Sequence, residues 1–306
     1  MLAQEANMAY ACSRNKQQRR KRISLLTTGD FTISQQDWNV TLLHPFTYLQ
    51  IELPPLKTFK DWEWDSFTPN LDNVYKTFIQ KFALSCSPSC TSDYTAMVIH
   101  GEMGKLAYCK AGDKAWTTIE TPLSKATACY FDVTYFKGKF YGVNCHGRIM
   151  SCDTEGDNPT EPQVVATLPS SMMLEICCYG THGFRVFEVN FESNTCEEMK
   201  NLGNNTVFVG DNSSFSVKAS EVMGYNRNSI YFTDDCLESY LGMDEEEKLE
   251  MTMMDMGIYR MEDGRIEPHF KGTSISYITP PLWIEGEVDH ILSRLDSVFF
   301  FFMFDE

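Results

Sequence analysis

The sequence contains no apolar run long enough to cross a lipid bilayer. Its tail, Val298 to Phe304, is wholly apolar, but a transmembrane helix needs about 20 such residues. Met1 to Tyr10 also lacks the continuous apolar stretch of a secretory signal peptide. We therefore expect no membrane association, and we expect the tail to form a terminal strand.

Positive charge is scarce. The chain has 26 Lys and Arg against 42 Asp and Glu, a net charge of −16, which argues against non-specific binding to nucleic acid or anionic membrane. The stretch from Arg14 to Arg22 is an exception, because it holds several basic residues and no acid. It is either a nuclear-import signal or a solvated, disordered arm.

Cysteine is not scarce, but its pattern does not indicate a disulfide framework. The count of 11 is odd, and Cys109, Cys129 and Cys152 lie inside apolar strand patterns. A buried thiol behaves as a small hydrophobic side chain. With no signal peptide, this favours a reducing compartment, the cytosol or the nucleus.

Motifs for catalysis and for cofactor or metal binding are missing. No G-x-S-x-G or H-E-x-x-H occurs. Gly101 to Lys105 lacks the spacing of a phosphate loop and fits a hairpin turn. Cys86 and Cys90, with His100 nearby, come closest to a zinc set, but a second ligand pair is absent. The acidic run Asp244 to Glu247 lacks the alternating ligands of a calcium loop. We predict no catalytic, cofactor-binding or metal-binding residues.

Several aspartates fall at the ends of predicted strands, and two interpretations stay open. They either form turns by binding nearby backbone N–H groups, which is common for Asp beside strands, or rim a central channel as catalytic acids. The residues are Asp132, Asp153, Asp211, Asp234 and Asp235.

A repeated unit of short strands dominates the sequence. In Phe131 to Asp153, Phe131, Val133 and Tyr135 alternate with polar residues, as in a half-buried strand. Turns at Lys137-Gly138 and His146-Gly147 separate this strand from two more. With a fourth strand at Gln163 to Leu168, the unit has about the 40 residues of one β-propeller blade.

The same rhythm continues from about Val40 to Ile284. Two segments differ: Leu71 to Leu84 has the apolar spacing of a helix, and Leu237 to Met256 is predicted to be a surface insertion. The other predicted strands are Val40–Leu43, Leu49–Leu53, Ala96–Ile99, Lys105–Cys109, Trp116–Ile119, Phe184–Phe191, Cys196–Lys200, Thr206–Val209, Phe215–Ala219, Asn228–Thr233, Gly257–Met261 and Arg265–Phe270.

We therefore predict an all-β fold, a β-propeller of about five or six degenerate four-stranded blades, not all of them necessarily complete. Radial closure avoids the free pairing edges that a long open sheet would expose. The predicted boundaries are a basic, disordered arm at 1–22, the propeller at 23–285, and a divergent tail at 286–306 as a candidate closing strand.

Seven phrases, in order, resemble the KIB-type β-propeller domain of plant F-box proteins. They include "LLHPFTYLQIELP" at Leu42 to Pro54, "GKLAYCKAGDKAWTTIE" at Gly104 to Glu120 and "PPLWIE" at Pro280 to Glu285. The resemblance covers roughly Ile23 to Glu285. It implies a propeller that presents a target protein to an SCF-type ubiquitin ligase, with no catalytic residue. No F-box pattern is recognisable before Ile23.

The expected function is therefore non-catalytic protein–protein interaction, with an unknown target protein and SCF components as partners. Tryptophan is enriched at binding hot spots, so Trp62, Trp64 and Trp283 are candidate anchors. Packing between blades is the other interpretation, which we prefer for Trp116 and Trp283. A hydrolase-like propeller enzyme using channel carboxylates, or an eroded copy without function, remain the alternatives.

Overall fold

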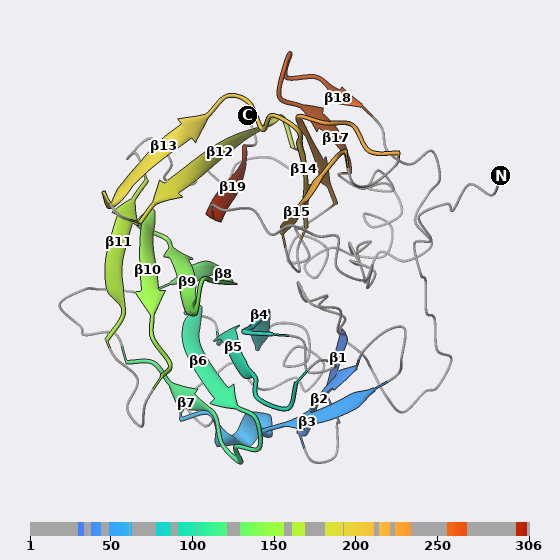
Figure 1. Cartoon of the computed structure of the whole chain (residues 1–306). Coiled ribbons are helices and arrows are strands. Elements are labelled where there is room, and N and C mark those ends of the chain that lie inside the picture. Colours follow the sequence, from blue (N-terminus) through green and yellow to red (C-terminus); the bar gives the residue numbers. More distant parts are fainter. Residues whose placement is uncertain are drawn as a thin grey trace, which may run out of the picture.

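In the part of the chain that the computed structural model describes, the regular structure is short β-strands with a single 3-10 helical turn. The structure describes residues 30–33, 38–43, 49–60, 62, 78–86, 91–101, 103–120, 129–155, 161–168, 181–191, 193–210, 214–220, 224–233, 256–267 and 298–304. Its strands form five sheets that follow one another around a common centre (Figure 1). The chain has a β-propeller fold, as the strand pattern predicted.

The first three sheets follow the order of the chain. Each consists of strands that are consecutive in the sequence and pair antiparallel. The first contains β1 (Asp30–Ile33), β2 (Val40–Leu43) and β3 (Gln50–Leu53), and is followed by a short 3-10 helix, η1 (Leu56–Thr58). The second contains β4 (Ile79–Leu84), β5 (Thr95–His100), β6 (Lys105–Lys110) and β7 (Thr117–Thr118). The third contains β8 (Tyr130–Phe136), β9 (Lys139–Asn144), β10 (Arg148–Cys152) and β11 (Gln163–Thr167), which is the predicted four-stranded unit.

The last two sheets depart from that simple pattern. The fourth has the order β13-β12-β19, so the C-terminal strand pairs with a strand from the middle of the chain. The fifth has the order β15-β14-β16-β17-β18, and β14 and β16 run parallel in it. The strands are β12 (Gly183–Asn190), β13 (Thr195–Met199), β14 (Asn205–Val209), β15 (Phe215–Lys218), β16 (Ser229–Phe232), β17 (Gly257–Arg260), β18 (Ile266–Glu267) and β19 (Val298–Phe304).

The apolar tail is a strand, as its sequence predicted. It pairs antiparallel with the whole of β12, from Gly183 opposite Phe304 to Val189 opposite Val298. The backbone groups of β19 that face β12 are thereby hydrogen bonded, which reduces the aggregation hazard of such an apolar segment.

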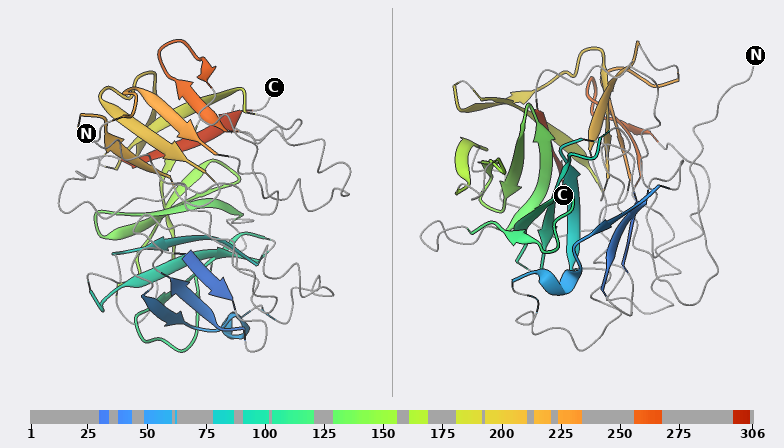
Figure 2. Two further views of the ribbon diagram at one scale, coloured as in Figure 1. Left: turned by 90° about the vertical axis from the view of Figure 1, so that its right-hand side faces the viewer. Right: turned by 60° about the horizontal axis from the view of Figure 1, so that its bottom comes forward.

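Adjacent sheets bury their faces against each other. Along β5, Ala96 and Val98 join the cluster shared with the first sheet, whereas Met97 and Ile99 join the cluster shared with the third. Alternate residues of a strand point to opposite faces, so both faces of this sheet are covered. Phe184 and Phe187 of β12 are divided in the same way between the fifth and third sheets. Seen from the side, the sheets form a continuous stack from blue to orange (Figure 2, left).

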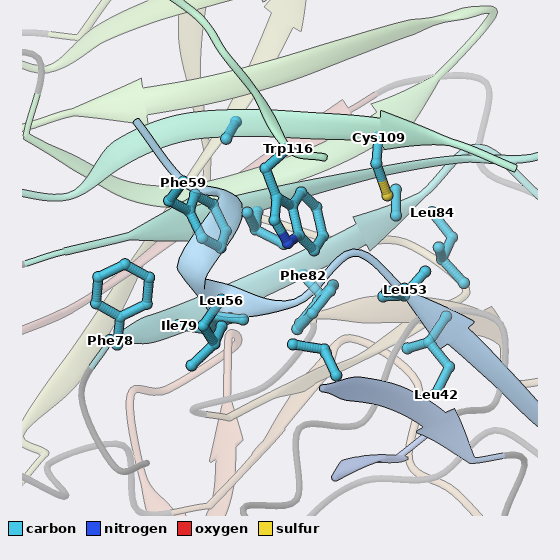
Figure 3. Close-up of a cluster of buried hydrophobic side chains, with 14 of the residues drawn as sticks. Leu42, Leu53, Leu56, Phe59, Phe78, Ile79, Phe82, Leu84, Cys109 and Trp116 are labelled. Carbon is cyan, nitrogen blue, oxygen red and sulfur yellow. The ribbon is translucent and has the colours of Figure 1, made fainter. Parts of the chain in front are cut away.

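The cluster between the first two sheets is the richest in aromatic rings (Figure 3). Trp116 stacks on Phe59, with ring centroids 4.9 Å apart, and its indole N–H donates to the carbonyl oxygen of Pro54 at 2.8 Å. Phe59 directly follows η1, so the helix that comes after the first sheet positions this ring against Trp116, which directly precedes β7 of the second sheet. The prediction that Trp116 packs between blades is confirmed.

The predicted helix from Leu71 to Leu84 is wrong over its described part. Ile79–Leu84 is β4, paired antiparallel with β5. Phe82 and Leu84 face the cluster of the first sheet, and Ala83 faces that of the third. A strand covered on both faces carries consecutive apolar residues and loses the two-residue alternation. The apolar residues of β4 therefore matched the spacing of a helix. Residues 71–77 lie outside the described part of the chain, as do residues 237–255 of the predicted insertion.

An ion-pair cluster at the outer side of the fourth sheet gives a pH-dependent prediction. The Arg185 guanidinium forms two hydrogen bonds with the Glu198 carboxylate, at 3.1 and 2.8 Å, and Lys200 Nζ lies 2.5 Å from Glu198 Oε1. These two cations, Arg185 first, lower the pKa of Glu198 from 4.5 to about 2, against a smaller opposing effect of burial.

A carboxyl group whose pKa is lower in the folded state stabilises that state above its unfolded pKa, and loses this contribution as the pH falls. We expect Glu198→Gln to cost about 1 kcal/mol of unfolding free energy at pH 7, since the partly exposed pair is screened. The cost should disappear between about pH 4.5 and pH 2. Urea unfolding of both proteins across this range measures it. A cost that does not change with pH would contradict the assignment.

Candidate functional site

The turn that joins β5 to β6, at the ends of two inner strands, offers the best-defined surface for a partner. The inner strands β4 and β8 lie nearest the middle of the ring in Figure 1 and pack against each other. The turn Gly101–Gly104, which joins β5 to β6, sits at the end of both. We call the surface formed by Gln80, Lys81, Met103, Phe131 and Asp132 the junction surface.

The turn is held from both inner strands. Gln80 Nε2 donates to the carbonyl oxygen of Gly101 at 2.8 Å, and the carbonyl oxygen of Gly104 accepts from the Tyr130 N–H at 2.9 Å. Gly104 N–H closes the turn onto Gly101 at 3.1 Å. A turn fixed at three points presents the side chain between them at little cost in conformational entropy on binding. That side chain is Met103, which is 52% exposed.

Both inner strands carry a β-bulge at the same place. The register shifts between Ile79 and Lys81 in β4, and between Tyr130 and Asp132 in β8. Gln80 and Phe131 are therefore the extra residues of two equivalent bulges. A bulge re-aims the side chain that it carries, and Phe131 is 44% exposed whereas its neighbour Tyr130 is buried.

The prediction that Phe131 alternates inward with Val133 is therefore wrong. Val133 does belong to the buried cluster, but the residue that shares its face is Tyr130. The extra residue in β8 shifts the alternation by one position, and the sequence has no glycine or proline there to signal it.

An ion pair links the two inner strands next to the bulges that carry Gln80 and Phe131. Lys81 Nζ lies 2.9 Å from Asp132 Oδ1, and the two side chains are 15% and 30% exposed. Asp132 Oδ1 also accepts from the Val133 N–H at 2.8 Å. The junction surface therefore combines two exposed apolar side chains with a partly buried charge pair, a mixture that suits recognition of another protein.

The described aspartates at strand ends have structural partners. Asp132 pairs with Lys81, and Asp153 Oδ1 accepts from the Glu155 N–H at 2.9 Å in a local turn. Among the described carboxyl groups, Glu198 and Glu267 have a clearly lowered pKa, in each case mainly because an arginine on the neighbouring strand hydrogen bonds to the carboxylate. Asp211, Asp234 and Asp235 lie outside the described residues.

The nearest approach to a zinc set is separated by the fold. Cys86 follows the end of β4, whereas His100 pairs with Ile79 at the other end of the same strand. About six residue spacings of roughly 3.3 Å lie between them. Cys86 Sγ instead donates to the Asp93 carbonyl oxygen at 3.1 Å, and Cys90 is outside the described residues. Within the described ranges no three His, Cys, Asp or Glu residues are grouped to hold a metal ion.

Gly101 to Lys105 forms the predicted hairpin turn. Trp62, predicted as an anchor, instead packs against the first core cluster, with its ring 5.1 Å from that of Trp38 and 5.0 Å from that of Phe78. Trp64 and Trp283 lie outside the described residues. Met103 was not among the predicted site residues, although a large apolar residue between two turn glycines is a usable signal in the sequence.

Comparison with known proteins gives consistent matches. The KIB1-4 beta-propeller family matches residues 11–260. A putative F-box protein of Arabidopsis thaliana is 25% identical over 237 residues, which are 67% of this chain and 64% of that protein. The F-box protein SKIP23 of Arabidopsis thaliana is 25% identical over 249 residues, which are 66% of this chain and 57% of SKIP23. The chain thus spans somewhat less than two thirds of the length of these relatives.

Solved structures with a related arrangement share little sequence. YCF48 from Cyanidioschyzon merolae aligns with a TM-score of 0.30 and 14% identity, covering 68% of this chain and 57% of YCF48. The Cps50 (Swd1) beta-propeller domain from Myceliophteria thermophila aligns with a TM-score of 0.28 and 8% identity, covering 67% of this chain and 55% of that one. In the part of the chain that the structure describes, no helix is long and apolar enough to span a membrane.

Proposed function

The chain belongs to the KIB1-4 beta-propeller family, and on this premise we propose that it is a non-catalytic module that binds a target protein. The observation that carries the proposal is the family match over residues 11–260, together with relatives that are F-box proteins. An F-box protein joins a substrate-binding domain to a ubiquitin ligase of the SCF type. The propeller here supplies the substrate-binding part of that arrangement.

The junction surface is the proposed place of binding. Met103 and Phe131 expose apolar side chains at one end of the ring, and Met and aromatic residues are enriched where proteins meet. Their backbone is fixed by the bonds from Gln80 and Tyr130. Lys81 and Asp132 lie beside them and add a charge pattern that favours one orientation of the partner.

The proposed partners are a target protein at the junction surface and components of an SCF ligase. Presentation of the target for ubiquitination is the proposed outcome, in the cytosol or the nucleus. Two of the strand-end aspartates, Asp132 and Asp153, are engaged in structural contacts, which favours the turn-forming interpretation for them over a hydrolase-like role.

A quantitative affinity purification from plant extract tests the surface. We expect Phe131→Asp, and more strongly the double variant with Met103→Glu, to reduce recovery of specific partners at least tenfold, because truncating or charging a central apolar anchor costs 2 kcal/mol or more. Val164→Asp is the matched control, since Val164 is 48% exposed on the outer strand β11. Partners lost equally in the control would contradict binding at the junction surface.

A second measurement separates target binding from the ligase role. The purified full chain is mixed with a purified SCF adaptor and analysed by size-exclusion chromatography. Co-elution supports a ligase component. Recovery of targets without adaptor binding would leave a protein-binding module and overturn the direct ligase role.

A further inference from the structure

Two cysteines face each other across the end of the β8–β9 hairpin. Tyr130 pairs with Asn144 in the ladder, and Cys129 and Cys145 are the next residues outward. The Cys145 N–H donates to the carbonyl oxygen of Cys129 at 2.8 Å, so the pairing continues through them. Both residues are half-buried thiols rather than halves of a disulfide.

Their geometry suits a bond between the two sulfur atoms. The backbone bond between them makes this a hydrogen-bonded pair of the antiparallel ladder, in which the Cα atoms lie about 5.5 Å apart and the two side chains are on one face. A disulfide needs a Cα separation of about 4.4–6.8 Å. The Cys145 thiol is also a hydrogen-bond partner of the Cys129 thiol, so the two sulfur atoms face each other.

We propose that Cys129 and Cys145 form a reversible disulfide by exchange with a small disulfide of the glutathione class, which makes this pair a redox modification site. This proposal does not depend on the proposed function. It assigns a chemical reaction to two residues that have no role in the junction surface.

The exchange balances in two steps. The Cys145 thiolate attacks one sulfur of the small disulfide, forms a mixed disulfide, and releases one small thiolate, which takes up a proton. The Cys129 thiol then loses its proton and attacks the Cys145 sulfur, which forms the intramolecular bond and releases the second small thiol. The two cysteines lose two electrons, and the small disulfide gains them.

The first attack is expected from Cys145. Burial raises the pKa of the Cys129 thiol, and the neighbouring Cys145 raises it further. A smaller fraction of Cys129 than of an ordinary exposed cysteine is therefore present as thiolate, which is the attacking form. Cys129 is better placed for the second step, where the proximity of the mixed disulfide compensates for a low thiolate fraction.

The bond would fix one end of the third sheet. Cys129 directly precedes β8, and Cys145 opens the β9–β10 turn, which the Asn144 side chain holds by accepting from the N–H groups of His146 and Arg148, each at 3.0 Å. Tyr130, next to Cys129, anchors the turn that presents Met103. Oxidation would thus stiffen the support of the neighbouring surface.

Other cysteines provide internal controls. Cys109 and Cys152 are fully buried in strands, and burial raises the pKa of Cys152 to about 12 and that of Cys109 as well. Such thiols are inert to exchange in the folded protein. We expect them to stay reduced under conditions that oxidise the proposed pair.

Peptide mapping of the full chain tests the proposal. The protein is incubated with oxidised glutathione, alkylated without reduction and digested with trypsin. The peptide 126–137 carries Cys129 and the peptide 140–148 carries Cys145, so the bond appears as a covalent pair of these peptides. We expect at least a tenfold excess of this pair over any other cysteine pair, and its loss on adding dithiothreitol.

The variants Cys145→Ser and Cys196→Ser complete the test. Cys145→Ser should abolish the linked pair, whereas Cys196→Ser should keep it, since Cys196 lies in β13 of the fourth sheet. Two results would overturn the proposal in the unmodified sequence: both cysteines alkylated singly after oxidation, or Cys129 linked mainly to another cysteine. Circular dichroism before oxidation confirms that each variant is folded.

Discussion

Replacing Trp116 with alanine is expected to lower the free energy of unfolding by about 3–5 kcal/mol, the usual cost of removing a buried large aromatic side chain. Trp116 is only 4% exposed and fills the space between the first two sheets. Its ring stacks on that of Phe59, and its centroid lies 6.3 Å from that of the Phe82 ring in an edge-on arrangement (Figure 3). Such aromatic pairs contribute beyond the area that they bury.

The indole N–H adds a buried hydrogen bond to what the Trp116 ring contributes by filling space. It donates to the carbonyl oxygen of Pro54 at 2.8 Å. We expect Trp116→Phe to cost about 1–3 kcal/mol, because it keeps an aromatic ring but leaves a buried acceptor unsatisfied. Urea unfolding followed by far-ultraviolet circular dichroism measures both variants.

Val164→Ala provides the control for the tryptophan series. Val164 is exposed on β11, so its truncation should change the unfolding free energy by less than about 0.5 kcal/mol. A Trp116→Ala protein as stable as this control would show that the first two sheets do not share a common core.

Replacing Gly104 with alanine is expected to cost about 3 kcal/mol, through backbone strain combined with steric overlap. Gly104 has a φ of +55°, a region that other residues enter at a cost. A Cβ atom there would lie 2.7 Å from the carbonyl oxygen of Tyr130 and 3.0 Å from its backbone nitrogen. Backbone atoms of a paired strand cannot move away easily.

Gly112→Ala separates these two causes. Gly112 has a φ of +85° in the turn after β6, but a Cβ atom would meet nothing within 4 Å. We expect it to cost only about 1 kcal/mol, the backbone strain alone. Urea unfolding of both variants gives the difference, which measures the close approach of the turn to β8. Equal costs would contradict that approach.

Loss of Gly104 also has a functional consequence. The turn that this glycine closes presents Met103, and its carbonyl oxygen receives the Tyr130 N–H. We therefore expect Gly104→Ala to reduce partner recovery along with stability, whereas Gly112→Ala leaves recovery intact. Gly104, with Gly112 as its control, thus links the packing of the second and third sheets to the junction surface.

Most strands could be predicted because their apolar residues follow turn residues at regular intervals. The hairpin from β8 to β9 turns at Lys137-Gly138, as predicted, and both residues have positive φ. Where the pattern failed, tertiary contacts were responsible. β4 looked helical because its two faces are covered by different sheets, and Phe131 looked buried because a bulge shifts its strand.

The candidate site was less predictable than the fold. Gln80, Met103 and Phe131 come from three different strands or turns, which the packing of β4 against β8 and the Lys81–Asp132 ion pair bring to one region. No spacing in the sequence reports a contact between segments about 50 residues apart. Trp62 was predicted as an exposed anchor but packs against Trp38 and Phe78. Its sequence neighbourhood does not show that these two rings cover it.

The sequence by itself determined the all-β class, the repeat and the family, because turn glycines and alternating apolar residues act over a few neighbouring positions. Only the tertiary structure decided the partner of the C-terminal strand, the parallel pair of β14 and β16, and the exposure of Phe131. These features depend on which edges and faces meet in space, and the free energy of such contacts is shared between residues far apart in the chain.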